Sequence, residues 1–416
     1  MAELIHTGIY TDNHTDKKIL LRTLTENRFS DAALSLPSER TVVFSKQTIE
    51  KLVEEEVLHD RFVIPPHEGT TLQYMSSGQQ RKALLTYLLS LNPECLILDD
   101  VYANIDLETQ CFITEKLQSL TEKMCIIQIF SRKRDLLPFV ERVVLPDARS
   151  AGIKAKFSRN VFLNADTLTS DKRTFCLPKS YETHNILPDN LIEIKNVSVD
   201  YGEKAVLRNI NWTICKEEFW QLKGPNGSGK STLVTMLTGD NPKAYGQDIY
   251  LFGRRKGSGE SIWDIKKQIG YFTPSMIQRF TRDDSVENMI VSGFNDSVGL
   301  YVESTDLQRD IARSWVDMLG SDFRKRSFQN LHPGQQRMVM TARAMVKHPP
   351  LLILDEPTID LDDTNSGLFI DMVNVIAAEK RIAIIYISHR HEENLRPEKI
   401  FELIPATEGF TGIIRQ

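Results

Sequence analysis

One stretch of this chain occurs twice, and the repeat limits what the chain can fold into. Residues 78–106 read GQQRKALLTYLLSLNPECLILDDVYANID, and residues 334–362 read GQQRMVMTARAMVKHPPLLILDEPTIDLD, which align without a gap. Both copies begin with GQQR, continue through a helical pattern to a proline, and end in a short apolar run closed by acids. Because both parts of the pattern recur at one spacing, we infer that the chain contains duplicated domains.

The repeat and the segments around it predict an α/β fold. The runs CLILDD and LLILDE are short and rich in Leu and Ile, as expected of strands buried in a parallel sheet. The second half begins with the strand-like LIEIKNVSV and continues as strand, glycine loop and helix, which favours a largely parallel sheet. Residues 283–331 are rich in helix formers, so we expect a helical subdomain there.

The organisation predicts two domains joined by a linker. Residues 147–190 are polar, lack a clear hydrophobic period and contain LPKSYETHNILPDN, which is typical of a linker. Residues 1–146 then form the first domain and residues 191–416 the second, as a length of 416 residues allows.

Charge and composition exclude several classes of protein. The formal net charge of −5 argues against broad electrostatic binding to nucleic acid, although a local patch stays open. The five cysteines show no CxxC spacing, which favours a reducing compartment over a disulfide or metal framework. The N-terminus lacks the apolar core of a signal peptide, and no stretch approaches the roughly 20 apolar residues of a membrane span. We therefore expect a cytoplasmic protein.

The segment GPNGSGKST matches the phosphate-loop pattern G-x-x-x-x-G-K-[ST] in full. Its glycines let the backbone wrap with N–H groups pointing inward, at the positive end of the following helix. We predict that Lys230 reaches the β- and γ-phosphates and that the Ser231 hydroxyl binds Mg²⁺. The predicted nucleotide-binding residues are Gly224, Pro225, Asn226, Gly227, Ser228, Gly229, Lys230, Ser231 and Thr232.

Three further residues follow apolar strands in the second half. Asp355 ends LLILD, where a strand tip presents a carboxylate to Mg²⁺, and Glu356 is placed to polarise an attacking water. His389 follows the apolar IIYIS, so it lies where the strand ends converge on ligand, and we predict a γ-phosphate contact. A helix cap for the two acids and a structural role for the histidine are the alternatives. His391 is interpreted as a bystander.

With these residues the chain resembles the ATP-binding cassette (ABC) ATPases, as two cassettes along nearly its whole length. In that family two cassettes stack head to tail, and each ATP lies between the phosphate loop of one and the signature, usually LSGGQ, of the other. The resemblance implies ATP and Mg²⁺ as cofactors. It also implies an aromatic residue that stacks on adenine, and Tyr201 occupies that place, with packing as the alternative.

A second stretch resembles one particular group within this family. Residues 251–271, LFGRRKGSGESIWDIKKQIGY, are similar to those of soluble tandem-cassette ATPases named molybdate-transport or photorepair ATP-binding proteins. Without the family, the stretch is a basic glycine loop followed by an amphipathic helix, for which a solvated loop is the alternative.

The two signatures differ in quality. The first cassette has MSSGQ, in which small residues let backbone approach a phosphate closely. The second has LHPGQ, where His332 is bulky and Pro333 has no N–H to donate. The predicted signature contacts to the nucleotide are Ser76, Ser77, Gly78 and Gln79.

The phosphate loops show the opposite pattern. In the first cassette, DKKILLRTL resembles the helix after the loop, with Lys17 at the lysine position, but Thr11 and Asp16 stand where glycines belong. An ordinary helix and a truncated N-terminus are the alternatives. Asp100 replaces the base, and Ser131 or a neighbour replaces the histidine. The fold expected is therefore two ABC-type P-loop NTPase cassettes, the first shortened or degenerate and the second complete.

These patterns predict one working site per chain, which combines residues 224–232, Asp355, Glu356 and His389 with residues 76–79 of the first cassette. One departure from the family is Pro274 and Ser275 at the usual position of a glutamine, with Gln278 nearby. Hydrolysis can therefore be slow, or coupling to a membrane subunit absent.

Three functions stay open at this point. The first is the ATP-binding subunit of an ABC transporter, whose partners are separate membrane-spanning subunits and whose place is the cytoplasm or the inner face of the plasma membrane. The second is a non-transport ATPase that acts on the ribosome or in DNA repair. Residues 147–190 lack the long charged helical pair expected of the translation group, and coiled-coil heptads and zinc-type cysteine pairs are absent from the sequence. The third is an ATP-binding scaffold with little turnover.

Overall fold

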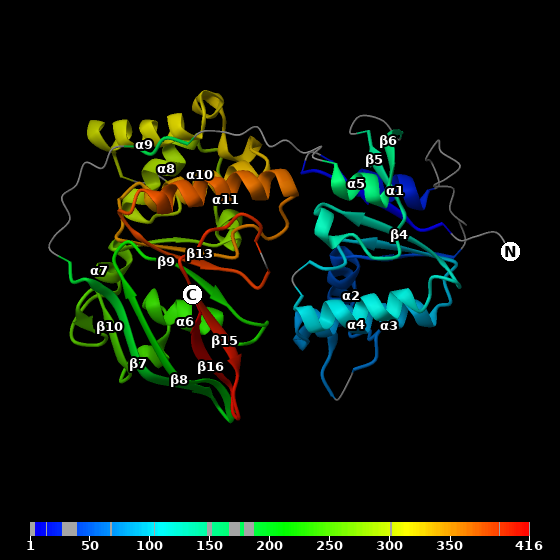
Figure 1. Ribbon diagram of the computed structural model, residues 1–416, viewed down its shortest axis with the longest axis horizontal. Helices are drawn as coiled ribbons and strands as arrows, with labels where there is room; N and C mark the ends of the chain where they lie inside the picture. Colours follow the sequence, from blue (N-terminus) through cyan, green and yellow to red (C-terminus); the bar gives the residue numbers. More distant parts are fainter. Residues whose placement is uncertain are drawn as a thin grey trace. The chain divides into compact units, whose positions relative to one another are not determined.

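The computed structural model divides the chain into two compact units (Figure 1). The first unit consists of Met1–Thr169 with Asp360–Thr364, and the second of Ser170–Ile359 with Asn365–Gln416. The structure describes residues 5–13, 15–26, 40–66, 69–103, 105–147, 152–165, 175–178, 187–299, 302–390 and 392–415. His391 lies outside the described residues. Across the described residues, none of the helices combines the length and the apolar composition needed to cross a bilayer.

The first unit contains one mostly parallel sheet between helices. Its strands are β1 (Thr7–Tyr10), β2 (Thr41–Phe44), β3 (Cys95–Asp99), β4 (Cys125–Phe130), β5 (Arg142–Pro146) and β6 (Ile153–Ser158). Its helices are α1 (Lys17–Thr25), α2 (Lys46–His59), α3 (Ser77–Ser90), α4 (Leu107–Gln118) and α5 (Arg159–Asn164), with 3-10 helices η2 (Leu72–Tyr74) and η3 (Lys133–Asp135).

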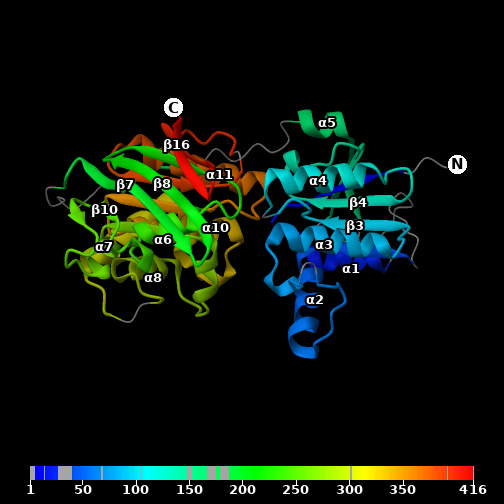
Figure 2. The same ribbon diagram turned by 90° about the horizontal axis from the view of Figure 1, so that it is seen from below.

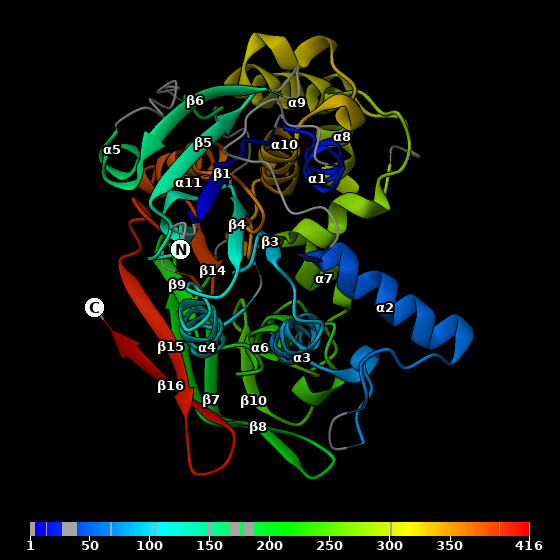
Figure 3. The same cartoon turned by 90° about the vertical axis from the view of Figure 1, so that its right-hand side faces the viewer.

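The strand order in this sheet is β2-β3-β4-β1-β5-β6, and β6 runs antiparallel to β5. Figure 3 shows β5, β1, β4 and β3 side by side in this order. Helix α1 covers one face through Leu20 and Leu24, which pack with Ile97 of β3. Helices α2, α3 and α4 cover the other face (Figure 2). Burial on both faces explains why the strand CLILD is apolar throughout rather than alternating.

The second unit is larger and adds an antiparallel layer. Its strands are β7 (Asn190–Tyr201), β8 (Lys204–Cys215), β9 (Phe219–Lys223), β10 (Asp248–Leu251), β11 (Arg254–Arg255), β12 (Ile269–Phe272), β13 (Leu351–Asp355), β14 (Ala383–Ile387), β15 (Lys399–Pro405) and β16 (Phe410–Arg415). Its helices are α6 (Lys230–Leu237), α7 (Ile262–Lys267), α8 (Val286–Val291), α9 (Asp306–Leu319), α10 (Pro333–Met345) and α11 (Asp363–Ala378). Its 3-10 helices are η4 (Pro242–Ala244), η5 (Pro274–Arg279), η6 (Ser292–Asn295), η7 (Ser321–Lys325) and η8 (Phe328–Asn330).

The two units share a core topology. The second sheet runs β11-β10-β7-β8-β16-β15-β9-β14-β13-β12, so its part β12-β13-β14-β9-β15-β16 repeats the order of the first unit. The repeated sequence also carries the same backbone turns. Asn92 and His348, at φ 50° and 51°, follow the helices, and Asp100 and Glu356, at φ 44° and 49°, follow the strands. Left-handed residues other than glycine are uncommon, so their recurrence together with the shared strand order confirms the duplication. The largely parallel sheets flanked by helices confirm the predicted α/β class.

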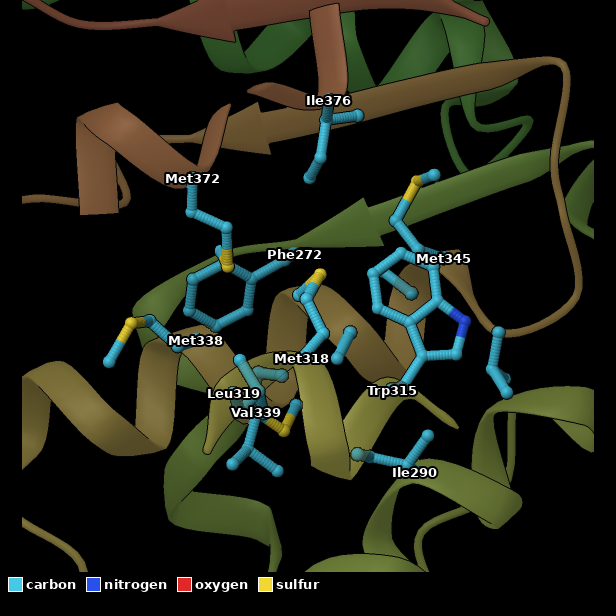
Figure 4. Close-up of a cluster of buried hydrophobic side chains, with 14 of the residues drawn as sticks. Phe272, Ile290, Trp315, Met318, Leu319, Met338, Val339, Met345, Met372 and Ile376 are labelled. Atoms are coloured by element: carbon cyan, nitrogen blue, oxygen red, sulfur yellow. The ribbon is translucent and has the colours of Figure 1, made fainter. Parts of the chain in front are cut away.

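The helical subdomain expected within residues 283–331 is present. Helices α8 and α9 pack with α10, and the shared core includes Trp315, Leu319, Met338 and Val339 (Figure 4). The subdomain is joined to the sheet by Phe272 of β12, which belongs to the same core. On the opposite face, α6 packs with the antiparallel strands β7 and β8. The core of the second unit therefore holds the phosphate-loop helix between two β layers.

Part of the segment predicted as a linker is folded. Strand β6 and helix α5 lie within residues 153–164, and β6 pairs with β5 as the antiparallel edge of the first sheet. Strand β6 reads IKAKFS and buries its apolar side chains only partly, because an edge strand has one neighbour. Its weak pattern explains why this stretch resembled a linker.

Candidate functional site

The predicted phosphate loop joins β9 to α6, as the motif requires. Gly229 caps the helix at φ 93°, and a Cβ there would lie 2.7 Å from Leu207 Cδ2. The buried Lys230 begins α6, and its Nζ donates hydrogen bonds to the carbonyls of Gly224 at 2.8 Å and Pro225 at 2.9 Å. The loop is therefore wrapped around its own lysine at the N-terminus of a helix, where an anion is favoured.

Asp355 lies at the end of β13, beside the neighbouring strand β12. The Tyr271 hydroxyl donates to Asp355 Oδ2 at 3.3 Å. Burial, and then the charge of Glu356, raise the pKa of Asp355 to about 6. A nearby cation would stabilise the ionised form, and carboxylate and hydroxyl oxygens are the ligands that Mg²⁺ prefers. Asp355 and the exposed Ser231 at the start of α6 therefore fit the predicted metal.

Glu356 and His389 form a hydrogen-bonded pair. Glu356 is held at φ 49° with its N–H bonded to Ile387 O at 2.9 Å, and its Oε1 lies 2.9 Å from His389 Nδ1. Since a carboxylate only accepts, Nδ1 carries the hydrogen, and the buried Nε2 has no partner among the described residues. Burial raises the pKa of Glu356, but the hydrogen bond from His389 and the charge of Lys230 outweigh it and hold this pKa below its usual value. The pair thus offers an ionised carboxylate and a ring nitrogen to a ligand.

Tyr201 ends β7 with 46% of its surface exposed. Asn241 Nδ2 donates to its hydroxyl at 3.0 Å, and Lys243 Nζ lies 5.7 Å from the centre of its ring. The ring is fixed at its hydroxyl and open to solvent, which suits stacking against a base better than core packing.

The predicted signature of the first unit forms the N-terminus of α3. Ser76 Oγ accepts from the Gln79 N–H at 3.3 Å, and the Ser76 N–H donates to Gln79 Oε1 at 2.9 Å, which closes a capping box. Ser76, Ser77 and Gln79 are exposed, and Gly78 faces Thr109, whose Oγ1 would lie 2.9 Å from an added Cβ. An exposed helix end of this kind is suited to an anion.

The corresponding end of α10 is different. His332 caps this helix, and its Nδ1 accepts from the Gln335 N–H at 3.3 Å. Pro333, which has no N–H, occupies the first helical position. Gly334 is buried, and a Cβ there would lie 2.4 Å from Asn365 Oδ1. The second signature thus lacks one N–H donor and fills its cap with an imidazole.

The first unit has a counterpart of the phosphate-loop helix. Strand β1 occupies the place of β9 in its sheet, so α1 corresponds to α6 and Lys17 to Lys230. The Asp16 carboxylate accepts from the N–H groups of Lys18 at 2.9 Å and Ile19 at 3.1 Å, at the helix end that corresponds to the phosphate-loop end of α6. Lys17 forms an ion pair with Asp100, and its Nζ lies 3.7 Å from Asp99 Oδ1. The chain's own charges therefore occupy this site.

Two arginines that support the carboxylates were not predicted. Arg337 Nη1 donates to Pro357 O at 2.7 Å, directly after Glu356. In the first unit, Arg81 Nη1 lies 3.3 Å from both carbonyl oxygens of the Asp100–Val101 turn. Both arginines are buried, and each is the last residue of a GQQR segment. The presence of this arginine in both copies of the repeat could have indicated a shared structural role.

Comparisons with known proteins agree on one family. The pattern of the family described as "ABC transporter" matches residues 207–359. The chain is 35% identical over 365 residues to "ABC transporter ATP-binding protein ModF" of Escherichia coli (strain K12), covering 83% of this chain and 74% of that protein. It is 27% identical over 330 residues to an uncharacterized ABC transporter ATP-binding protein of Schizosaccharomyces pombe, covering 78% and 66%. Among solved structures, archaeal ABCE1 in "Model of ribosome-bound archaeal Pelota and ABCE1" has a TM-score of 0.63 at 15% identity, covering 98% of this chain and 74% of that one.

Proposed function

The chain belongs to the ABC transporter ATP-binding proteins and binds and hydrolyses ATP, and we propose that it does so at one composite site. In this proposal the second unit holds the nucleotide and the first unit supplies its signature, residues 76–79. The proposal rests mainly on the finding that each unit has the part of the site that is defective in the other unit. The second unit has the complete loop and a weak signature, and the first unit has a well-formed signature and a site filled by its own charges.

The second unit binds the triphosphate through residues 224–232 in this proposal. The N–H groups of the loop and Lys230 contact the β- and γ-phosphates, while Tyr201 stacks on adenine. Ser231 and Asp355 hold Mg²⁺, which neutralises charge on the phosphates when it is bound. The raised pKa of Asp355 supports this assignment, because burial destabilises the ionised carboxylate and a bound cation would stabilise it.

Glu356 is the proposed general base. Its lowered pKa keeps it ionised near neutrality, so it can accept a proton as a water attacks the γ-phosphorus. The bond between the γ-phosphorus and the β,γ-bridging oxygen then breaks, and ADP and phosphate leave. In this proposal His389 orients Glu356 through Nδ1, and its Nε2, which has no partner among the described residues, donates to a γ-phosphate oxygen when the ring is protonated at both nitrogens.

The partner we propose is a separate membrane-spanning transporter subunit, with the chain in the cytoplasm at the inner face of the membrane. The names of the ABC transporter ATP-binding relatives support this assignment. The alternative is a macromolecular partner, such as the ribosome or DNA. Co-purification with a membrane protein would favour the first, and co-sedimentation with ribosomes or DNA the second.

Matched substitutions at the two helix caps test the composite site. Ser76→Trp places a bulky side chain at the first signature, and we expect turnover to fall at least about 100-fold through loss of transition-state donors. His332→Trp changes the aligned residue of the second signature, and we expect turnover within about threefold of the parent chain. Normal turnover in the Ser76→Trp protein, with its fold intact by circular dichroism, would refute the pairing.

A further inference from the structure

The loop that carries His389 is held firmly on its N-terminal side. Gln221 lies on β9, directly ahead of the phosphate loop, and its Nε2 donates to Ser388 Oγ at 3.0 Å. Ser388 Oγ in turn donates to Arg390 O at 2.8 Å, across the histidine. Both Gln221 and Ser388 are buried. The histidine loop is thus fixed to the strand that leads into the phosphate loop.

On its C-terminal side the same loop is held by a buried carboxylate. Glu392 is only 6% exposed, and its Oε1 accepts from Thr358 Oγ1 at 2.5 Å. Tyr386 Oη lies 3.3 Å from Thr358 Oγ1. A threonine hydroxyl has one hydrogen, which goes to Glu392, so Tyr386 must be the donor in the second bond. A chain of hydrogen bonds therefore runs from β14 through Thr358 to Glu392.

These bonds join the two loops that carry the catalytic pair. Thr358 is two residues after Glu356, and Glu392 is three residues after His389. Glu356 has the left-handed backbone, which needs support from its surroundings. We propose that Glu392 is a positioning residue, which acts through Thr358 to keep Glu356 and His389 at hydrogen-bonding distance. The inference rests on the proposed role of that pair.

Substitutions of Glu392 separate positioning from binding. Glu392→Ala should lower kcat by about 10- to 100-fold, because a misplacement of about 1 Å has an effect of this size. The KM for ATP should change less than about twofold, since the phosphate loop is untouched. Glu392→Gln keeps an acceptor oxygen for Thr358 and should retain most of kcat. Glu393→Ala, at the exposed neighbouring glutamate, is the matched control and should behave as the parent chain.

Substitution of Thr358, the hydrogen-bond partner of Glu392, gives an independent test of the positioning role. Thr358→Val removes the donor and should lower kcat as Glu392→Ala does, and the double variant should lose no more than either single variant, because both remove one bond. If Glu392→Ala does not fold, as its melting curve would show, Thr358→Val decides the question alone.

The outcomes distinguish this inference from the proposed function. If Glu356→Gln turns over ATP normally, the catalytic assignment itself is wrong. If Glu356→Gln is inactive while the folded Glu392→Ala or Thr358→Val protein has the kcat of Glu393→Ala, the positioning role is wrong. Additive losses in the double variant would also contradict it.

Discussion

Removing the lysine that fills the first unit's site should destabilise that unit. We consider Lys17→Met, which keeps the length of the side chain and removes its charge. Asp99 and Asp100 then remain side by side without their cation, in a site where both side chains are mostly buried. The exposed Lys18 is the adjacent residue on α1, so Lys18→Met is a matched control that removes the same charge from the same helix turn.

The size of the effect follows from the geometry. Lys17 Nζ and Asp99 Oδ1 are 3.7 Å apart, so their attraction is about 4.5 kcal/mol at an effective dielectric constant of about 20. Dehydration of the charges offsets much of this, and 29% of the lysine side chain is still exposed. We expect a net loss of about 1–3 kcal/mol in the free energy of unfolding. In a unit of this size, each kcal/mol lowers Tm by about 2–4 °C.

Amide hydrogen exchange on the full chain measures the local stability of each unit separately. In the Lys17→Met protein, amides of α1 and β3 should exchange faster, whereas those of α6 and β13 should be unchanged. Adding ATP should protect α6 in the parent chain and in the Lys17→Met protein and leave α1 unprotected in both, because the Asp16 carboxylate already accepts from the N–H groups at the start of α1. Equal exchange of α1 and β3 in the Lys17→Met and Lys18→Met proteins would refute the stabilising role of the cluster.

Three further predictions concern the site and its charges. Lys230→Ala should reduce ATP turnover at least about 100-fold, measured by phosphate release, because it removes the cation that contacts the phosphates in the proposed site. Glu356→Gln should slow hydrolysis about 100- to 10,000-fold while ATP still binds, measured by filter binding beside single-turnover assays. Burial lowers the pKa of Lys17, but the charges of Asp100 and Asp99 outweigh it and raise that pKa. A raised lysine pKa stabilises the fold fully below the unfolded value of about 10.4 and less as pH rises through the folded value. The stability difference between the parent chain and Lys17→Met should therefore hold from neutral pH to about pH 10 and shrink above it, as measured by urea unfolding.

The duplicated architecture was predictable because the repeat fixes a helix, a turn and a strand at one spacing. The same spacing carries the left-handed turns at Asp100 and Glu356, so the backbone of both copies follows from local sequence. The edge strand β6 was not predicted, because IKAKFS alternates apolar residues with lysines over too short a run to stand out from a linker.

The ion pair and hydrogen bond that hold the site residues in place could not be predicted from the sequence, for a different reason. Lys17 meets Asp100 because β1 and β3 belong to one sheet with β4 between them, and Thr358 meets Glu392 because the strands β13 and β14 before them are neighbours. Side-chain partners of this kind depend on the tertiary fold, and a single sequence gives no pairing signal for them. The motif residues are predicted from the sequence alone, whereas the residues that contact them are known only from the structure.

The number of ATP molecules bound per chain tests the central claim most directly. Equilibrium binding of radiolabelled ATP with Mg²⁺ to the Glu356→Gln protein should saturate at one nucleotide per chain. Lys230→Ala added to this protein should abolish binding, and Lys17→Met added instead should leave the stoichiometry at one. Saturation at two nucleotides per chain, or one that survives Lys230→Ala, would contradict the account.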